Sequence, residues 1–203
     1  ACGVDFAVGC TYKYLNGGPG SPGFLYVAPK HQAKTENIIK GWLGHISPFS
    51  FSKTFEPANG IDKMLIGTPS IIASTALEAS LDILESISIG DIRTESMKLS
   101  QFFIDQMKTN CPDLRLASPT QPEERGGHLA YTFDEGYSLM QCLIEKGVIG
   151  DFRMPNLIRF GINPLFINKN DIIYGIANFL NLCSITVPFD NYSLEFIAPS
   201  GFE

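Results

Sequence analysis

Apolar residues recur along this chain with two different periods, one typical of strands and the other of helices. Short apolar runs at residues 3–10 and 24–28 predict two buried strands. Because too few residues separate these runs for a helical crossover, we expect the two strands to pair antiparallel. Residues 35–66 show little sustained period and predict a long excursion, a kind of segment that is often functional in compact domains.

A helical period begins after residue 67. Thr68 can cap a helix, and Pro69 fits its first position. The apolar residues that follow at helical spacing are Ile72, Ala76, Ala79, Ile83 and Ile87. We expect Gly90 to break this helix and a second helix to cover about residues 91–110, where Cys111-Pro112 ends it.

After residue 112, short strands alternate with helices, which predicts an α+β lobe. Strands are expected at residues 114–116, 128–133 and 157–160, and helices at 136–146 and 171–183. The inward positions expected on these two helices include Ile144 and Ile173. Residues 184–203 are apolar and aromatic without a clear period, and the pattern assigns them no element.

Length and composition allow one large domain, or a domain with a smaller lobe, since 44% of the 203 residues are hydrophobic. The net charge is −6 and no dense basic run occurs, so a nucleic-acid or membrane-surface partner is unsupported. No apolar stretch reaches the roughly 20 residues that cross a bilayer. The five cysteines include no C-x-x-C pair and predict free thiols in a reducing, cytoplasmic compartment. The three histidines lack metal-ligand spacing, so we expect no metal site.

Lys13 has the most suggestive surroundings of any polar residue. It follows the first apolar run, stands between Tyr12 and Tyr14, and precedes a glycine-rich stretch at residues 17–23. A desolvated lysine loses its proton more readily, and the free amine is a nucleophile. The alternative is a lysine at a strand end that extends to water, and Lys13 by itself favours that alternative.

Three further residues each have a functional and a structural interpretation. Thr68 stands at a helix N-terminus, where free N–H groups can bind a phosphate, or it is an ordinary cap. Trp42 is the only tryptophan, and its indole N–H serves either a ligand or packing. Arg159 lies in an apolar strand and needs an anionic partner, which is either a substrate carboxylate or a structural Asp or Glu.

Several motifs together resemble one family. They are Thr11-Tyr12-Lys13-Tyr14-Leu15-Asn16, the glycine-rich turn, Gly41-Trp42-Leu43-Gly44-His45 and Ile158-Arg159. This series resembles the kynureninases, which are pyridoxal 5′-phosphate (PLP) enzymes of the aspartate-aminotransferase fold, fold type I. The resemblance covers residues 1 to about 183 and is most specific over residues 4–20.

The resemblance implies an α/β fold with a defined division of the chain. Residues 1–90 would be the C-terminal part of the PLP-binding large domain, and residues 91–110 a connecting helix. Residues 111–183 would form the small α+β domain. The role of the tail, residues 184–203, stays open.

The resemblance also implies a role for each site residue. Lys13 matches the lysine that binds PLP covalently, and Tyr12 matches a tyrosine that contacts the cofactor phosphate and takes part in proton transfer. Trp42 and Thr68 match further phosphate contacts, with the tryptophan usually supplied across a homodimer interface. Arg159 matches the arginine that binds the substrate α-carboxylate.

The implied reaction is hydrolysis of L-kynurenine, or of 3-hydroxykynurenine, to anthranilate or 3-hydroxyanthranilate and L-alanine. This reaction belongs to tryptophan catabolism and NAD biosynthesis. PLP serves as the electron sink, and the protein positions it.

The chain departs from the family pattern in one large respect. The family's ring-stacking aromatic, the aspartate at the pyridine nitrogen and several phosphate donors precede the PLP lysine, and here only twelve residues do. The chain also begins without methionine, so we expect a fragment with little or no activity of its own. The alternatives are another fold type I enzyme, such as a cysteine desulfurase or a class V aminotransferase, and an inactive structural or dimerising product. A desulfurase would need a catalytic cysteine loop, and residues 118–127 contain no cysteine.

Overall fold

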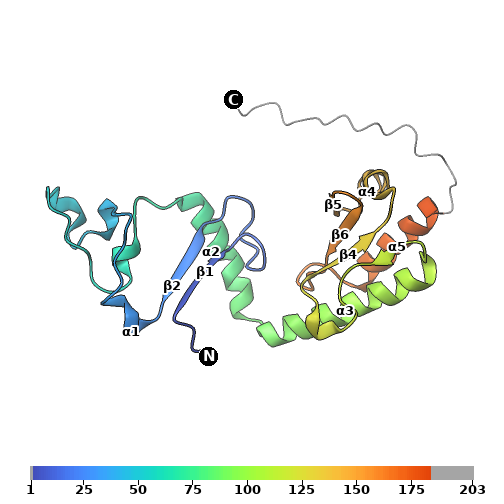
Figure 1. Cartoon of the computed structure of the whole chain (residues 1–203), viewed down its shortest axis with the longest axis horizontal. Helices are drawn as coiled ribbons and strands as arrows, with labels where there is room; N and C mark the ends of the chain where they lie inside the picture. The colour runs from blue at the N-terminus through green and yellow to red at the C-terminus, as the bar shows by residue number, and fades with distance from the viewer. Residues whose placement is uncertain (1, 184–203) are drawn as a thin grey trace, which may run out of the picture. The chain divides into compact units, whose positions relative to one another are not determined.

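The computed structural model describes residues 2–183, and these fall into two compact units that divide between Ser88 and Ile89 (Figure 1). The sequence expectations for residues 184–203 lie outside the described residues. No helix in the described range is both long enough and apolar enough to cross a membrane.

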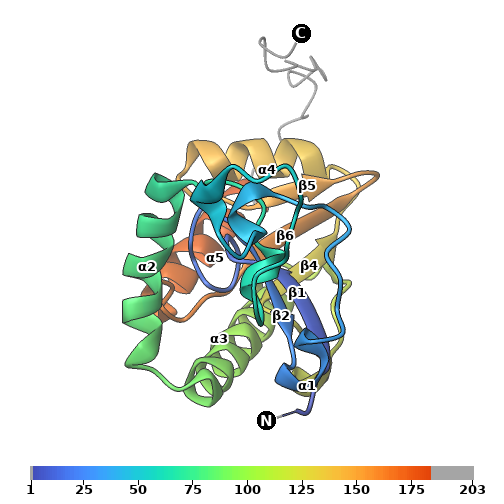
Figure 2. The ribbon, with the colours of Figure 1, turned by 90° about the vertical axis from the view of Figure 1, so that its left-hand side faces the viewer.

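The first unit contains a two-stranded antiparallel ribbon, which confirms the predicted pairing. Strands β1 (Phe6–Cys10) and β2 (Gly23–Val27) pair in a register that joins Phe6 to Val27 and Cys10 to Gly23 (Figures 1 and 2). The prediction that both strands are buried is wrong: the exposed fraction is 79% for Val8 and 53% for Phe6. A ribbon of two strands cannot cover its own faces, and β1 and β2 form a sheet with each other alone among the described residues.

The predicted excursion consists of short turns of helix. Helix α1 (Pro29–Gln32) follows β2 directly, and three turns of 3₁₀ helix lie at Trp42–Gly44, Pro48–Ser50 and Asp62–Met64. Elements of three or four residues carry no measurable period, which is why the sequence pattern did not predict them.

The boundaries of the next two helices differ from the prediction. Helix α2 (Ile71–Glu85) begins after Ser70, because the first helical hydrogen bond runs from the Ser74 N–H to the Ser70 carbonyl; Thr68 is therefore not its cap. Gly90 does not break a helix either, since it lies in the first turn of α3 (Ile89–Asn110). A glycine costs little in a first turn, where the backbone N–H groups lack intrahelical partners.

The second unit is a four-stranded antiparallel sheet with three helices. The strand order is β3-β4-β6-β5, with β3 at Arg115–Leu116, β4 at His128–Thr132, β5 at Asp151–Arg153 and β6 at Leu157–Gly161. The helices are α3, α4 (Gly136–Glu145) and α5 (Lys169–Cys183). The predicted strands and helices of this lobe are confirmed, whereas β5 was not predicted.

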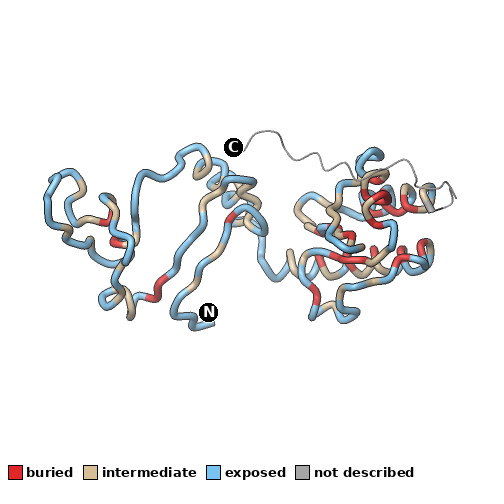
Figure 3. Tube along the Cα trace, turned by 45° about the horizontal axis from the view of Figure 1, so that its top comes forward, coloured by how far each residue is buried: buried red, intermediate tan, exposed pale blue. Residues whose placement is uncertain are grey.

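The apolar core of the described residues lies mainly in this second unit, as the concentration of buried segments in Figure 3 shows. The three helices and the sheet contribute Leu99, Phe103, Met107, Leu129, Leu139, Leu143, Ile158, Phe160, Ile176 and Phe179. The prediction that Ile144 and Ile173 point inward is wrong, since they are 40% and 52% exposed. Each follows a core residue, Leu143 or Ile172, and one step along a helix turns a side chain by about 100°.

Candidate functional site

The loop that carries Lys13 is anchored at its base by a buried threonine. Thr11 donates a hydrogen bond from Oγ1 to the Pro22 carbonyl. The same Thr11 Oγ1 lies 2.6 Å from the Ser21 hydroxyl oxygen. The Gly17 N–H donates to the Thr11 carbonyl at 3.0 Å. These bonds close the segment between β1 and β2 into a defined loop.

Helix α2 holds the same loop from another direction. The Ser80 hydroxyl donates to the Leu15 carbonyl at 2.6 Å, although 65 residues separate the two. Asn16 adopts a φ of 53°, and its N–H donates to the Lys13 carbonyl at 2.9 Å, so the chain turns sharply after Lys13. The backbone of Lys13 is therefore positioned by both the ribbon and α2.

The side chain of Lys13 is exposed rather than buried. Its Nζ lies 5.3 Å from the centroid of the Tyr12 ring, and hydrogen bonding to Tyr12 raises the pKa of Lys13 above its ordinary value. Of the two interpretations of Lys13, the described residues agree with the side chain that extends to water, because the strand before it is exposed. A lysine acts as a nucleophile at neutral pH when its pKa is lowered, and burial of Lys13 by further protein segments would lower it.

Trp42 lies where two backbone segments cross. A Cβ at Gly41 would lie 2.0 Å from the Ile66 carbonyl oxygen, and a Cβ at Gly44 would lie 2.5 Å from the Leu65 carbonyl oxygen. Only glycine permits these approaches. The Leu43 N–H donates to the Ile66 carbonyl at 3.3 Å, so the two glycines of the Gly-Trp-Leu-Gly sequence hold it against residues 65–66.

This crossing brings Trp42 beside the segment that contains Thr68. The indole Nε1 of Trp42 lies 3.9 Å from the position that a Cβ on Gly67 would occupy. Both Trp42 and Thr68 are exposed, and neither side chain makes a hydrogen bond within the described part of the chain. Helix α2 starts just beyond, with no side-chain cap. An indole N–H, a hydroxyl and open backbone N–H groups form a donor set that suits a phosphate.

An apolar cavity of 620 Å³ adjoins Trp42. It is lined in part by His45, Phe49, Phe51 and Phe55, and the ring of Phe49 meets Trp42 edge-on at 5.6 Å. His45 Nδ1 accepts from the Ser47 N–H at 2.8 Å, and its Nε2 lies 3.2 Å from the Thr54 carbonyl oxygen. These two contacts hold the imidazole ring of His45 against the backbone of residues 47 and 54. The sequence indicated a functional excursion here but not this cavity.

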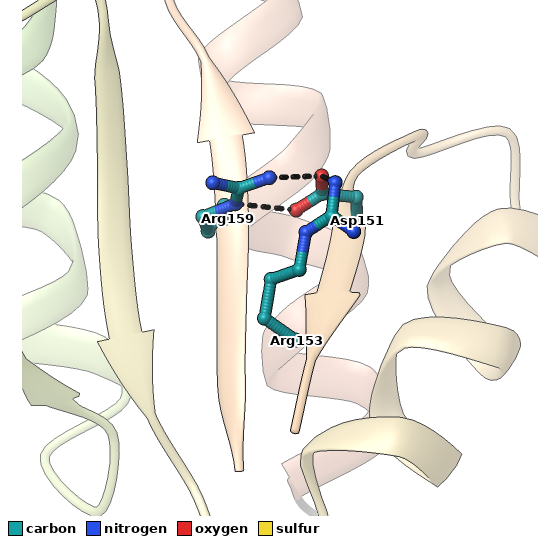
Figure 4. Close-up of polar contacts among 3 residues, drawn as sticks. All are labelled: Asp151, Arg153 and Arg159. Atoms are coloured by element: carbon teal, nitrogen blue, oxygen red, sulfur yellow. Dashed lines mark hydrogen bonds and ion pairs between the residues drawn. The ribbon is translucent and has the colours of Figure 1, made fainter. Parts of the chain in front are cut away.

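Arg159 has a structural partner in the second unit. Its Nε donates to Asp151 Oδ1 at 2.7 Å and its Nη2 donates to Asp151 Oδ2 at 2.5 Å (Figure 4). The Arg159 guanidinium lowers the pKa of the Asp151 carboxyl. Of the two partners that the sequence allowed, the structural aspartate is therefore present. The signal that could have revealed it is Gly150-Asp151-x-Arg153, which a short turn joins to β6.

The five predicted site residues thus fall into three places. Tyr12 and Lys13 lie together on the loop after β1, and Trp42 lies beside Gly67-Thr68, all in the first unit. Arg159 lies on β6 of the second unit. Across residues 2–183 the structure contains no group of three or more His, Cys, Asp or Glu that could hold a metal ion.

Comparison with known sequences finds relatives that share one name, kynureninase. The sequence model of the kynureninase C-terminal domain matches residues 92–179. The kynureninase of Deinococcus radiodurans is 40% identical over 184 residues, which is 88% of this chain and 45% of that protein. The kynureninase of Pseudomonas fluorescens is 38% identical over 172 residues, which is 84% of this chain and 41% of that protein. The chain therefore spans less than half the length of these curated relatives.

Comparison with solved structures identifies the fold. The apo cysteine desulfurase of Thermococcus onnurineus NA1 superposes with a TM-score of 0.73 at 16% identity, over 89% of this chain and 47% of that one. The cysteine desulfurase CsdA of Escherichia coli gives a TM-score of 0.71 at 19% identity, over 89% and 46%. A C-DES variant with glycine covalently linked to its PLP cofactor gives 0.69 at 17% identity, over 88% and 46%. The predicted fold class, an α/β fold like the C-terminal part of fold type I PLP enzymes, is confirmed, and this likeness concerns the fold alone.

Proposed function

Because the chain is a relative of the kynureninases over most of its length and contains their C-terminal domain, we propose that it supplies part of a kynureninase active site. The reaction proposed is the hydrolysis of L-kynurenine, or of 3-hydroxykynurenine, to L-alanine and anthranilate or 3-hydroxyanthranilate. The pathway proposed is tryptophan catabolism and NAD biosynthesis in the cytoplasm. The observation that carries the proposal is that Trp42 lies beside Gly67, in the segment that contains Thr68 and precedes α2, within a chain of this ancestry.

The residues present fit PLP. Trp42 Nε1, the Thr68 hydroxyl and the backbone N–H groups at the start of α2 would bind its phosphate, since these donors are unused within residues 2–183. Tyr12 would add a further phosphate contact from the loop after β1. Lys13 Nζ would hold the cofactor covalently. When bound, PLP supplies the electron sink for cleavage next to the substrate α-carbon.

The remaining chemistry belongs to side chains of this chain. The substrate amine would displace Lys13 from the cofactor, and the freed amine of Lys13 would then act as a general base at the substrate α-carbon, with the Tyr12 hydroxyl assisting proton transfer. Arg159 binds the α-carboxylate through its planar guanidinium. Water adds to the side-chain ketone, and the bond between Cβ and Cγ breaks to release the aromatic acid and alanine.

We propose that the 203-residue chain by itself has little activity, and the exposure and raised pKa of Lys13 support this. We propose that the remaining part of a kynureninase, together with a second subunit, covers this lysine. A homodimer with shared sites is the arrangement that we expect, and the exposed indole of Trp42 supports it.

The test uses this chain joined to the part of a kynureninase that it does not span. The joined protein should convert L-kynurenine to anthranilate and alanine, and Lys13→Ala should lower turnover by about 10³-fold or more. Lys30→Ala is the matched control, because Lys30 is an exposed lysine of the same unit that pairs with Asp5. Normal turnover by Lys13→Ala, or by the 203-residue chain alone, would contradict the proposal.

A desulfurase is the second candidate, because cysteine desulfurases are among the structural neighbours. Their identity to this chain is below 20%, so the likeness concerns the fold. Release of sulfur from L-cysteine by the joined protein, without kynurenine turnover, would favour this candidate. An inactive joined protein that still dimerises would favour a structural product.

A further inference from the structure

Asp151 and Arg159 face each other across a strand pair. They are direct partners in the antiparallel register of β5 and β6. A Cβ at Gly150 would lie 2.7 Å from the Arg159 carbonyl oxygen, so glycine lets β5 approach β6 at this point. On either side of Arg159, the side chains of Ile158 and Phe160 are buried in the core. The sheet therefore fixes the backbone of both members of the ion pair.

The carboxylate of Asp151 takes only one edge of the Arg159 guanidinium. A guanidinium has five N–H donors, and two of its edges can each hold a carboxylate in a bidentate manner. Asp151 occupies the edge formed by Nε and Nη2. The Nη1 atom points away from Asp151 in Figure 4, and within residues 2–183 it makes no hydrogen bond. The edge formed by Nη1 and Nη2 is therefore available to a second carboxylate.

The charge of the cluster favours an added anion. Arg153 Nη2 also lies 3.1 Å from Asp151 Oδ2, so two guanidinium groups share one carboxylate. The three side chains are partly exposed, at 30% for Arg159, 43% for Asp151 and 62% for Arg153. The cluster keeps one net positive charge, and a carboxylate can approach it without displacing Asp151.

We propose that Asp151 is a positioning residue, which holds Arg159 by its Nε edge and presents the Nη1 edge to the substrate α-carboxylate. This inference rests on the proposed function. Without Asp151, the long side chain of Arg159 would populate many rotamers. Substrate binding would then have to order this side chain, and the entropy cost would weaken the binding. Asp151 therefore acts on substrate binding rather than on the bond-breaking step.

The first test observes the arginine directly and needs no turnover. In the ¹⁵N-labelled 203-residue chain, the Nε–H of Arg159 should exchange with water at least about tenfold more slowly than in Asp151→Asn, because a charge-assisted hydrogen bond protects it. Arg153→Gln is the matched control, since it removes the neighbouring cation and keeps the pair, and it should preserve this protection. Equal exchange rates in the wild type and Asp151→Asn would overturn the proposal.

The second test measures kinetics in the joined protein. Asp151→Asn should raise KM for L-kynurenine by about tenfold and change kcat by less than about threefold, because the loss is in ground-state binding. Asp151→Glu keeps the charge on a longer side chain, and its KM should lie between the KM of the wild type and that of Asp151→Asn. Arg153→Gln should change KM less than Asp151→Asn does.

The outcomes separate this inference from the proposed function. A wild-type joined protein without kynurenine turnover overturns the function. An active one in which Asp151→Asn changes only kcat, or changes neither constant, overturns the role of Asp151 alone. If Asp151→Asn fails to fold, Asp151→Glu decides, and an unchanged KM in that variant overturns the role.

Discussion

At the scale of single residues, Tyr131 presents an unusual hydroxyl. It lies in the core of the second unit, 2% exposed, and among the described residues its hydroxyl has no hydrogen-bond partner. Burial raises the pKa of Tyr131 above its ordinary value. A buried polar group without a partner destabilises the fold, since it gives up its bonds to water.

We expect Tyr131→Phe to raise the free energy of unfolding by up to about 1 kcal/mol at neutral pH. Because the folded-state pKa lies above the unfolded one, the wild type should lose stability as pH rises beyond about 10, whereas the variant should not. Denaturant unfolding at pH 7 and pH 10.5 measures both effects.

Tyr174→Phe is the matched control for this prediction, because the Tyr174 hydroxyl donates to the Lys146 carbonyl at 2.8 Å. Its loss should lower stability by less than about 1 kcal/mol, given that Tyr174 is exposed. A Tyr131→Phe variant that is clearly less stable than the wild type would show that the hydroxyl has a partner after all.

Residue chemistry could be predicted from the sequence only in part. The requirement of Arg159 for an anion followed from its place in an apolar strand, but the choice between substrate and Asp151 depended on a strand pairing. For Lys13 the sequence allowed either a desolvated amine or a side chain that extends to water, and the structure places it at the surface. Burial depends on which segments cover a residue, and those segments are distant in sequence.

At the scale of elements, the crossing of residues 41–44 over residues 65–66 sets the position of Trp42. Gly41→Ala should lower the free energy of unfolding of the joined protein by about 1–3 kcal/mol, because its Cβ would meet the Ile66 carbonyl oxygen at 2.0 Å. It should also weaken PLP binding, which the cofactor's visible absorbance reports.

Gly67→Ala is the control for the same crossing, since its nearest neighbour would be Trp42 Nε1 at 3.9 Å, an ordinary contact. This variant should fold as stably as the wild type. If Gly41→Ala were equally well tolerated, the crossing would not determine where the indole lies.

The helices of eight or more residues were predicted with their correct identity, because an apolar stripe recurs over several turns. The sequence placed the break between α2 and α3 at Gly90, whereas α2 ends at Glu85 and α3 begins at Ile89. Strand β5 was missed because three residues show no alternation. The sequence nevertheless contains both members of the ion pair across β5 and β6, Asp151 and Arg159.

At the scale of the whole molecule, the two units differ in how much apolar surface they bury. Within the described residues, Val27 and Ala28 are the buried hydrophobic residues of the first unit, whereas the second unit has a continuous core. Apolar residues of the ribbon and of α2, including Phe6, Val8, Ile72 and Ile83, are exposed. Local stability follows buried apolar contacts.

We therefore expect hydrogen exchange to divide the 203-residue chain. Amides of β4 and β6 should exchange at least about tenfold more slowly than those of β1 and β2. In the joined protein the amides of β1 should become protected as well. Mass spectrometry of deuterium uptake measures both states, and equal protection of β1 and β6 in the 203-residue chain would contradict this expectation.

Lys13 is the residue that we propose binds PLP covalently. The most direct measurement is borohydride reduction of the PLP-loaded joined protein, followed by peptide mapping. We expect one stoichiometric phosphopyridoxyl group on Lys13, and none in that peptide from Lys13→Ala. Label on another lysine, or spread over several lysines with none on Lys13, would contradict it.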